Sequence, residues 1–72
     1  MWNNRIVEFG KGKGLYFQVC EVFYNDAGVP NGYAAIDDLV ADSPQELIRL
    51  VDFIHRDLHR GELDKILIAD EL

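Results

Sequence analysis

Residues 15–24, Leu-Tyr-Phe-Gln-Val-Cys-Glu-Val-Phe-Tyr, decide the fold of this chain. Aromatic and β-branched side chains dominate the stretch, and such residues favour the pleated surface of a β-strand. Residues 25–32, Asn-Asp-Ala-Gly-Val-Pro-Asn-Gly, then carry typical turn residues, and an apolar run restarts at Tyr33. The pattern predicts a long strand, a reversal and a return strand at 33–36 that pairs antiparallel with the first.

A further strand and a glycine-rich turn precede this hairpin. Residues 5–9, Arg-Ile-Val-Glu-Phe, have the composition of a strand, and residues 10–14, Gly-Lys-Gly-Lys-Gly, favour a tight reversal. The same glycines and lysines could form a phosphate-binding loop. In the P-loop motif, however, such a loop opens a helix, whereas a strand follows here. The hairpin interpretation is therefore preferred.

The clearest local signal is the start of a helix predicted at 44–60. Ser43 and Glu46 have the spacing of a capping box, and Pro44 occupies the first helical position, where its missing donor costs nothing. Phe53 lies off the apolar stripe of this helix and is expected to be partly exposed in a monomer. The stripe itself consists of Leu47, Leu50, Val51, Ile54 and Leu58, and Gly61 suits the C-terminal cap.

These elements predict an α+β fold for a single domain of residues 1–72. It is a three-stranded antiparallel β-meander with one amphipathic α-helix packed on one face and a short C-terminal tail. The tail could be a short strand or a helical turn, because periodicity cannot distinguish them over so few residues. The expected core consists of Ile6 or Val7, Phe17, Val19, Leu47, Leu50, Val51, Ile54 and Leu58.

The strand at 15–24 is apolar on both faces. One face carries Leu15, Phe17, Val19 and Phe23, and the other carries Tyr16, Cys20, Val22 and Tyr24. A single helix can cover one face, so the other would form an exposed apolar patch of a kind that monomers rarely have. We therefore expect a homodimer or a protein partner. The expected interaction surface consists of Tyr16, Val22, Tyr24 and Phe53.

Composition argues against several other partners. The chain has 13 acidic and 7 basic side chains, a net charge of −6, and its basic residues are scattered. Binding to nucleic acid needs clustered Lys and Arg, so no nucleic acid partner is expected. No apolar run approaches the roughly 20 residues that span a bilayer, and the N-terminal residues do not resemble a signal peptide, so no membrane partner is expected. A single cysteine, Cys20, is typical of a reducing compartment, and we expect a cytoplasmic location.

Two features of the sequence could carry chemistry. His55 and His59 lie one helical turn apart and could share a metal ion, but zinc needs further ligands, for which Asp52 and Glu62 are the nearby candidates. Cys20 could act as a nucleophile, but a thiol in the middle of a strand is expected to be buried and inert. We therefore expect a non-enzymatic interaction protein without a cofactor, such as a regulator or inhibitor that acts through its sheet surface. The alternative is a metal-binding or thiol-dependent activity that uses His55, His59 or Cys20.

Several motifs resemble those of a group of small uncharacterised prokaryotic proteins. They are Trp-Asn-Asn-Arg-Ile-Val at 2–7 and Glu-Val-Phe-Tyr-Asn-Asp-Ala-Gly-Val-Pro at 21–30, followed by Gly-Tyr at 32–33. In that group W-N-x-R-[IV]-V precedes E-V-[FY]-Y-[DN]-x-x-G-x-P and an E-E-L-type helix. The resemblance covers the chain to about residue 50 and departs at residues 59–72, which replace a shorter ending. It implies a β-rich hairpin with one helix in an intracellular setting, and it implies no activity. The order of strands and capped helix also looks like that of HicB-type antitoxin domains, at the level of architecture alone.

Overall fold

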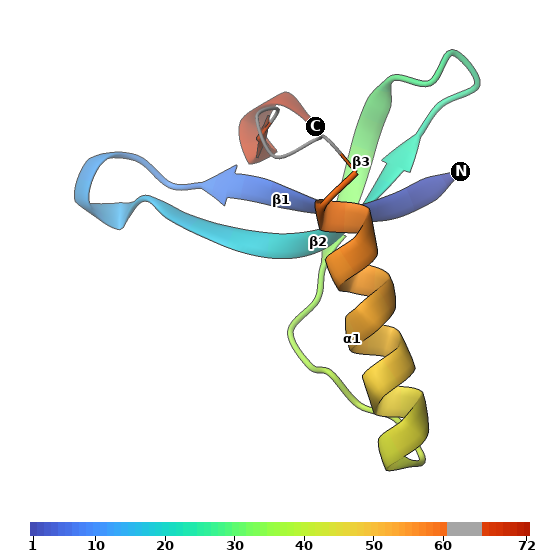
Figure 1. The fold of residues 1–72 in the computed structure, drawn as a ribbon. Coiled ribbons are helices and arrows are strands. Elements are labelled where there is room, and N and C mark those ends of the chain that lie inside the picture. Colours follow the sequence, from blue (N-terminus) through green and yellow to red (C-terminus); the bar gives the residue numbers. More distant parts are fainter. Residues whose placement is uncertain (61–65) are drawn as a thin grey trace.

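The computed structural model describes residues 1–60 and 66–72. The fold is α+β, with one α-helix among the described residues and a four-stranded mixed, curled sheet in the order β3-β2-β1-β4 (Figure 1). The elements along the chain are β1 Trp2–Phe9, the 3-10 helix η1 Gly12–Gly14, β2 Tyr16–Tyr24, β3 Pro30–Ala35, α1 Pro44–Leu58, β4 Leu67–Ile68 and the 3-10 helix η2 Ala69–Glu71.

The predicted antiparallel meander is confirmed by the pairing of β1 with β2 and of β2 with β3. The prediction of three strands is wrong, because the C-terminal tail adds β4 as a parallel neighbour of β1, with Val7 opposite Leu67. The tail then continues into η2. It therefore supplies both the short strand and the helical turn between which the sequence could not decide.

The two reversals of the meander have different causes. Between β1 and β2 the chain turns at Gly10, where φ is +77° and a Cβ atom would lie 2.1 Å from the carbonyl oxygen of Gly14, so only glycine fits. Between β2 and β3 the Asn25 side chain holds the turn, since its Oδ1 accepts hydrogen bonds from the amides of Ala27 at 2.9 Å and Val29 at 3.0 Å. Because a side chain accepts these turn amides, the backbone groups of the flanking strands remain available for pairing with each other.

Helix α1 begins as predicted and leaves the sheet. The Ser43 Oγ accepts a hydrogen bond from the Glu46 amide at 3.1 Å, and Pro44 is the first helical residue. The helix ends at Leu58, two residues earlier than predicted, and the proposed cap Gly61 lies outside the described residues. Figure 1 shows the N-terminal half of α1 beyond the sheet, with the connection from β3 beside it.

The core lies on the sheet face opposite to the predicted one. Among the described residues the fully buried apolar side chains are Val7, Cys20 and Val22. The side chains that pack against them are Phe9, Tyr24, Leu67, Ala69 and Leu72, so the tail and not the helix covers this face.

This arrangement confirms part of the expected core and contradicts part of it. Val7 is buried as expected, but Phe17 is 56% exposed and Val51 is 45% exposed. The prediction for these two residues is wrong because α1 meets the sheet mainly at β1 and does not lie along β2. The remaining expected core residues are half-buried; they are Ile6, Val19, Leu47, Leu50, Ile54 and Leu58.

Candidate functional site

An exposed aromatic cluster lies where α1 meets the sheet, and we define it as Trp2, Phe23 and Phe53. Trp2 and Phe23 are directly opposite in the β1–β2 register and so share a sheet face, and the Trp2 and Phe53 rings are 6.3 Å apart. The three side chains are 48%, 40% and 44% exposed, respectively. Large aromatic side chains dominate interface energetics, so this cluster is a candidate contact surface.

A buried carboxylate fixes the helix beside this cluster. Asp57 is 7% exposed, and its Oδ2 accepts hydrogen bonds from the Asn4 backbone amide at 2.9 Å and from Asn4 Nδ2 at 3.0 Å. Asn4 is itself buried, so both of its donors depend on this carboxylate. Because Asp57 lies one turn after Phe53, the same contact orients the Phe53 ring towards Trp2.

The sequence analysis did not predict the contact between Asn4 and Asp57, although the sequence contains a signal for it. Asp57 lies between Phe53 and the apolar stripe on the helical wheel, where a solvated acid would not be expected. Asn4 similarly interrupts the apolar alternation of the first strand. Two polar residues at otherwise apolar positions indicate a mutual contact, because buried polar groups need partners.

The four residues of the expected interaction surface do not form one surface. Val22 has no exposed area and cannot contact a partner unless the chain rearranges. Tyr24 is half-buried, and its hydroxyl accepts from Arg5 Nη1 at 2.9 Å and donates to Asn3 Oδ1 at 2.7 Å. Two of the four remain exposed and lie on different parts of the molecule: Tyr16, which stacks on Phe9, and Phe53 in the aromatic cluster.

An open hollow of about 710 Å³ lies beside the Tyr24 hydroxyl, between Met1, the β2–β3 turn and Leu67. Its polar lining includes Arg5, which is 7% exposed and is held by Tyr24. These polar groups bond to one another across β1 and β2, so they stabilise this end of the sheet.

The two histidines at the end of α1 lie side by side, one helical turn apart. The rings of His55 and His59 are exposed with centroids 4.1 Å apart, and His59 Nδ1 lies 2.9 Å from the His55 carbonyl oxygen. Within residues 1–60 and 66–72 no group of three or more His, Cys, Asp or Glu side chains could hold a metal ion. The suggested ligand Glu62 lies outside the described residues.

The Cys20 thiol is fully buried in the core, with its Sγ 3.9 Å from the Gln18 carbonyl oxygen. Burial, and secondly the negative charge of Asp37, raise the pKa of this thiol. A thiol that stays protonated and has no access to solvent is a poor nucleophile.

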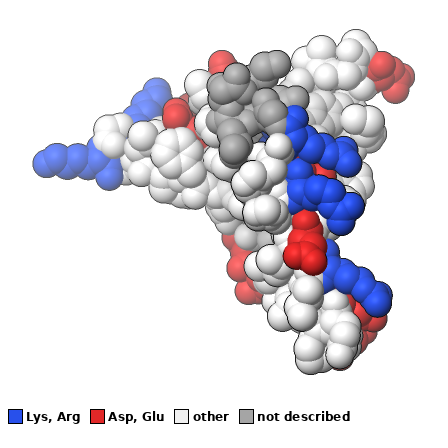
Figure 2. Space-filling view, viewed as in Figure 1, with Lys and Arg blue, Asp and Glu red and all other residues white. Residues whose placement is uncertain are grey.

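Charged side chains of both signs lie on the face of the molecule drawn in Figure 2. In Figure 2 the basic side chains gather along α1 and at the tip of the β1–β2 hairpin, and acidic side chains lie among those of the helix. In the part of the chain that the structure describes, no helix has the length and apolar character needed to cross a membrane. Comparison of the sequence and structure with protein-family models, curated proteins and solved structures found no match, so function must be inferred from the surface described above.

Proposed function

We propose that this protein is a small non-enzymatic interaction module that binds another protein through the aromatic cluster Trp2, Phe23 and Phe53. The observation that supports this is the amount of surface the folded chain exposes. Its accessible area is 5395 Å², whereas a compact monomer of 8.2 kDa exposes about 4,500 Å². The difference of roughly 900 Å² is close to the area of about 800 Å² that each partner buries in a standard interface.

The shape of the molecule explains the excess. The radius of gyration is 13.1 Å, against roughly 11 Å for a compact chain of 72 residues. The N-terminal half of α1 projects from the sheet and exposes Ile48 by 61% and Val51 by 45%. Such surface favours association, because burial of a few hundred Å² of apolar area is worth on the order of 10 kcal/mol before the entropic cost of binding.

A capture experiment with matched variants tests the proposal. Immobilised wild-type protein, Phe53→Ala and Arg49→Ala would be exposed to lysate, and a captured protein would then be purified and titrated by calorimetry. Phe53→Ala should weaken the affinity about 10- to 100-fold, as loss of an aromatic anchor usually does. Arg49→Ala, on the same exposed helix, should leave the affinity within about twofold. A saturable partner whose affinity is equal for both variants would overturn the proposed surface.

The alternative proposal, a metal-binding or thiol-dependent activity, rests on the 4.1 Å separation of the His55 and His59 rings and on Cys20. It predicts stoichiometric uptake of Zn²⁺ at micromolar concentration, which would quench or shift the fluorescence of Trp2. It also predicts rapid alkylation of the native thiol. The interaction module predicts neither result, so the two proposals are separated by one zinc titration and one alkylation assay.

A further inference from the structure

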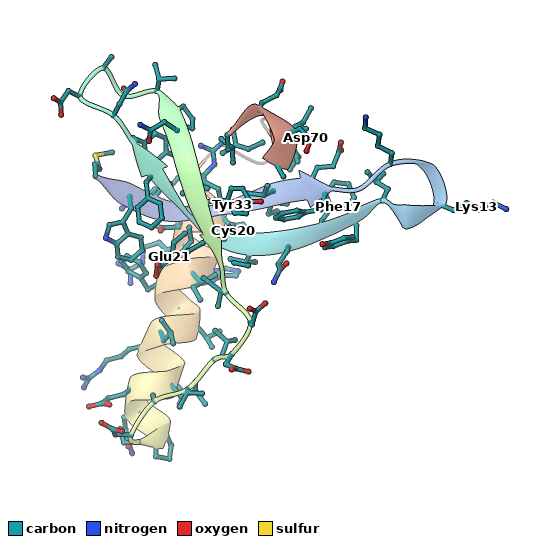
Figure 3. All side chains as sticks on the ribbon, turned by 180° about the vertical axis from the view of Figure 1, so that it is seen from behind. Lys13, Phe17, Cys20, Glu21, Tyr33 and Asp70 are labelled. Carbon is teal, nitrogen blue, oxygen red and sulfur yellow. The ribbon has the colours of Figure 1, made fainter. Side chains whose placement is uncertain are left out.

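We infer that two copies of this chain pair edge to edge through β3, so that an antiparallel β3–β3 pair across a two-fold axis joins their sheets into one continuous sheet. The inference goes beyond the proposed function, because it identifies a second copy as the partner of a strand edge that lies apart from Trp2 and Phe53. Figure 3 shows β3 as the outer strand that crosses the sheet, with Tyr33 on it.

The backbone of β3 presents unused hydrogen-bonding groups. β3 is the last strand in the order β3-β2-β1-β4, so one of its edges has no hydrogen-bonded strand beside it among the described residues. The Ile36 amide donates to the Val19 carbonyl oxygen at 3.1 Å. The backbone N–H and C=O groups of the even-numbered residues 32, 34 and 36 therefore point towards β2. Because antiparallel pairs alternate, the backbone groups of Tyr33 and Ala35 point outward. A second antiparallel strand could bond to both.

The same edge lacks the features that usually prevent pairing. Residues 27–36 form the longest stretch of the sequence without a charged side chain, in a chain of net charge −6. Exposed edges are normally protected by charged side chains, proline or bulges. Pro30 and the register shift between Phe23 and Tyr24 protect the beginning of β3. Residues 32–35 have no such protection, so a second copy meets no like charge there.

One register makes this edge complementary to itself. If the two-fold axis passes between the two Ala34 residues, Tyr33 lies opposite the partner's Ala35 and Gly32 lies opposite the partner's Ile36. Each large side chain then faces a small one. A Cβ on Gly32 would lie 3.9 Å from Cδ2 of Phe23, so the Phe23 ring already lies above this position and would contact the partner's Ile36. The pairing thus places the partner's Ile36 at the edge of the aromatic cluster, beside Phe23, and leaves Trp2 and Phe53 exposed.

The self-complementary register favours a second copy over a single added peptide strand. Residues 32–36 of a second copy supply a small residue opposite each large one, whereas an unrelated peptide would match this edge only by chance. A symmetric dimer satisfies this for both copies with the same residues. Pairing of an isolated extended peptide on the same edge is the alternative that the experiment below would reveal as a chain that stays monomeric.

Disulfide cross-linking tests the register directly. Residues opposite each other in a non-hydrogen-bonded antiparallel pair have Cα atoms about 4.5 Å apart, within the range that a disulfide spans. Ala34→Cys should therefore form a covalent dimer under glutathione buffer at about 100 μM protein, at least tenfold faster than Ala27→Cys. Ala27 is an exposed alanine in the β2–β3 turn, and native Cys20 is buried and should not cross-link. Equal rates for the two variants, or no cross-linking, would overturn the inference.

Sedimentation equilibrium and hydrogen exchange complete the test. Wild-type protein should show a dimer mass within about 10 to 300 μM, and Ala35→Pro, which removes an outward amide that β2 does not use, should be a folded monomer. If Ala35→Pro does not fold, exchange of the wild-type Tyr33 and Ala35 amides decides, since these two should become at least tenfold slower from dilute to concentrated samples. A monomer throughout, or concentration-independent exchange, contradicts the dimer. Loss of cross-linking with Phe53-dependent capture intact would overturn this inference alone, and the reverse result would overturn the proposed function alone.

Discussion

The two faces of β2 carry similar apolar side chains, yet the middle of one face is buried and the other face is largely exposed. On the first face Cys20 and Val22 have no exposed area, whereas on the second Phe17 and Phe23 are 56% and 40% exposed. The difference comes from the elements that cover each face. β4 and η2 pack over the first face, and α1 reaches the second with its C-terminal turns alone. Burial in this small sheet is thus decided by the covering segments and not by the strand itself.

The largest expected loss in the free energy of unfolding comes from a substitution that releases α1 from the second face of the sheet. Asp57→Ala removes the acceptor of both Asn4 donors and leaves them buried without a partner, which should lower the free energy of unfolding by about 3 kcal/mol. Asp52→Ala, on the exposed side of the same helix, should change it by less than about 0.5 kcal/mol. Urea denaturation of the two variants measures the difference. Similar free energies for both would mean that α1 is not held by this contact.

A core substitution tests the comparison of the two faces itself. Val22→Ala opens a cavity beneath the tail and should lower the free energy of unfolding by about 2 kcal/mol. Phe17→Ala removes a larger side chain from the exposed face and should lower it by less than about 1 kcal/mol. The measurement is again chemical denaturation, at a fixed protein concentration because association would add stability. A greater loss for Phe17→Ala would show that a partner copy or a different packing covers the second face in solution.

The strands and the helix start could be predicted because their signals are local. The composition of β2, the turn residues after Tyr24 and the Ser43 cap each act within a few residues of chain. The boundaries shifted where pairing extended an element beyond its apolar run. β1 begins at Trp2 and β3 at Pro30, because residues there find partners on β2 that no local pattern reveals.

The segments that cover the two faces of β2 could not be predicted, because their positions depend on contacts between residues far apart in the sequence. β4 has two residues, too few to show a period, and its position is set by pairing with Val7 across most of the chain. The expectation that Phe53 would be partly exposed is confirmed at 44%. Val22 was expected on an interaction surface and is instead buried, since the tail and not a partner covers its face.

The smallest expected effect is a pH dependence that reports how completely the tail covers the first face. Burial raises the pKa of the Cys20 thiol, so the folded chain keeps a proton that the unfolded chain loses above about pH 8.5. The unfolded state then binds fewer protons, and the free energy of unfolding must fall as the pH rises from there to the raised pKa, by at most about 1.4 kcal/mol per pH unit. Between pH 7.5 and 9.5 wild-type protein should therefore lose more stability than Cys20→Ala, whose other titrating groups are the same.

Asp37→Asn sharpens this last measurement. Asp37 is the second cause of the raised pKa after burial, so its removal should reduce the extra loss only in part. The asparagine keeps an Oδ1 acceptor for the Gln18 Nε2 hydrogen bond, which is 3.0 Å long in the wild-type chain, and any weakening of that bond changes stability equally at every pH without altering the slope. An equal pH slope in wild-type protein and Cys20→Ala would mean that the thiol is solvated in the folded state. The tail would then not seal the first face, and the contrast between the two faces of β2 would be smaller than the structure indicates.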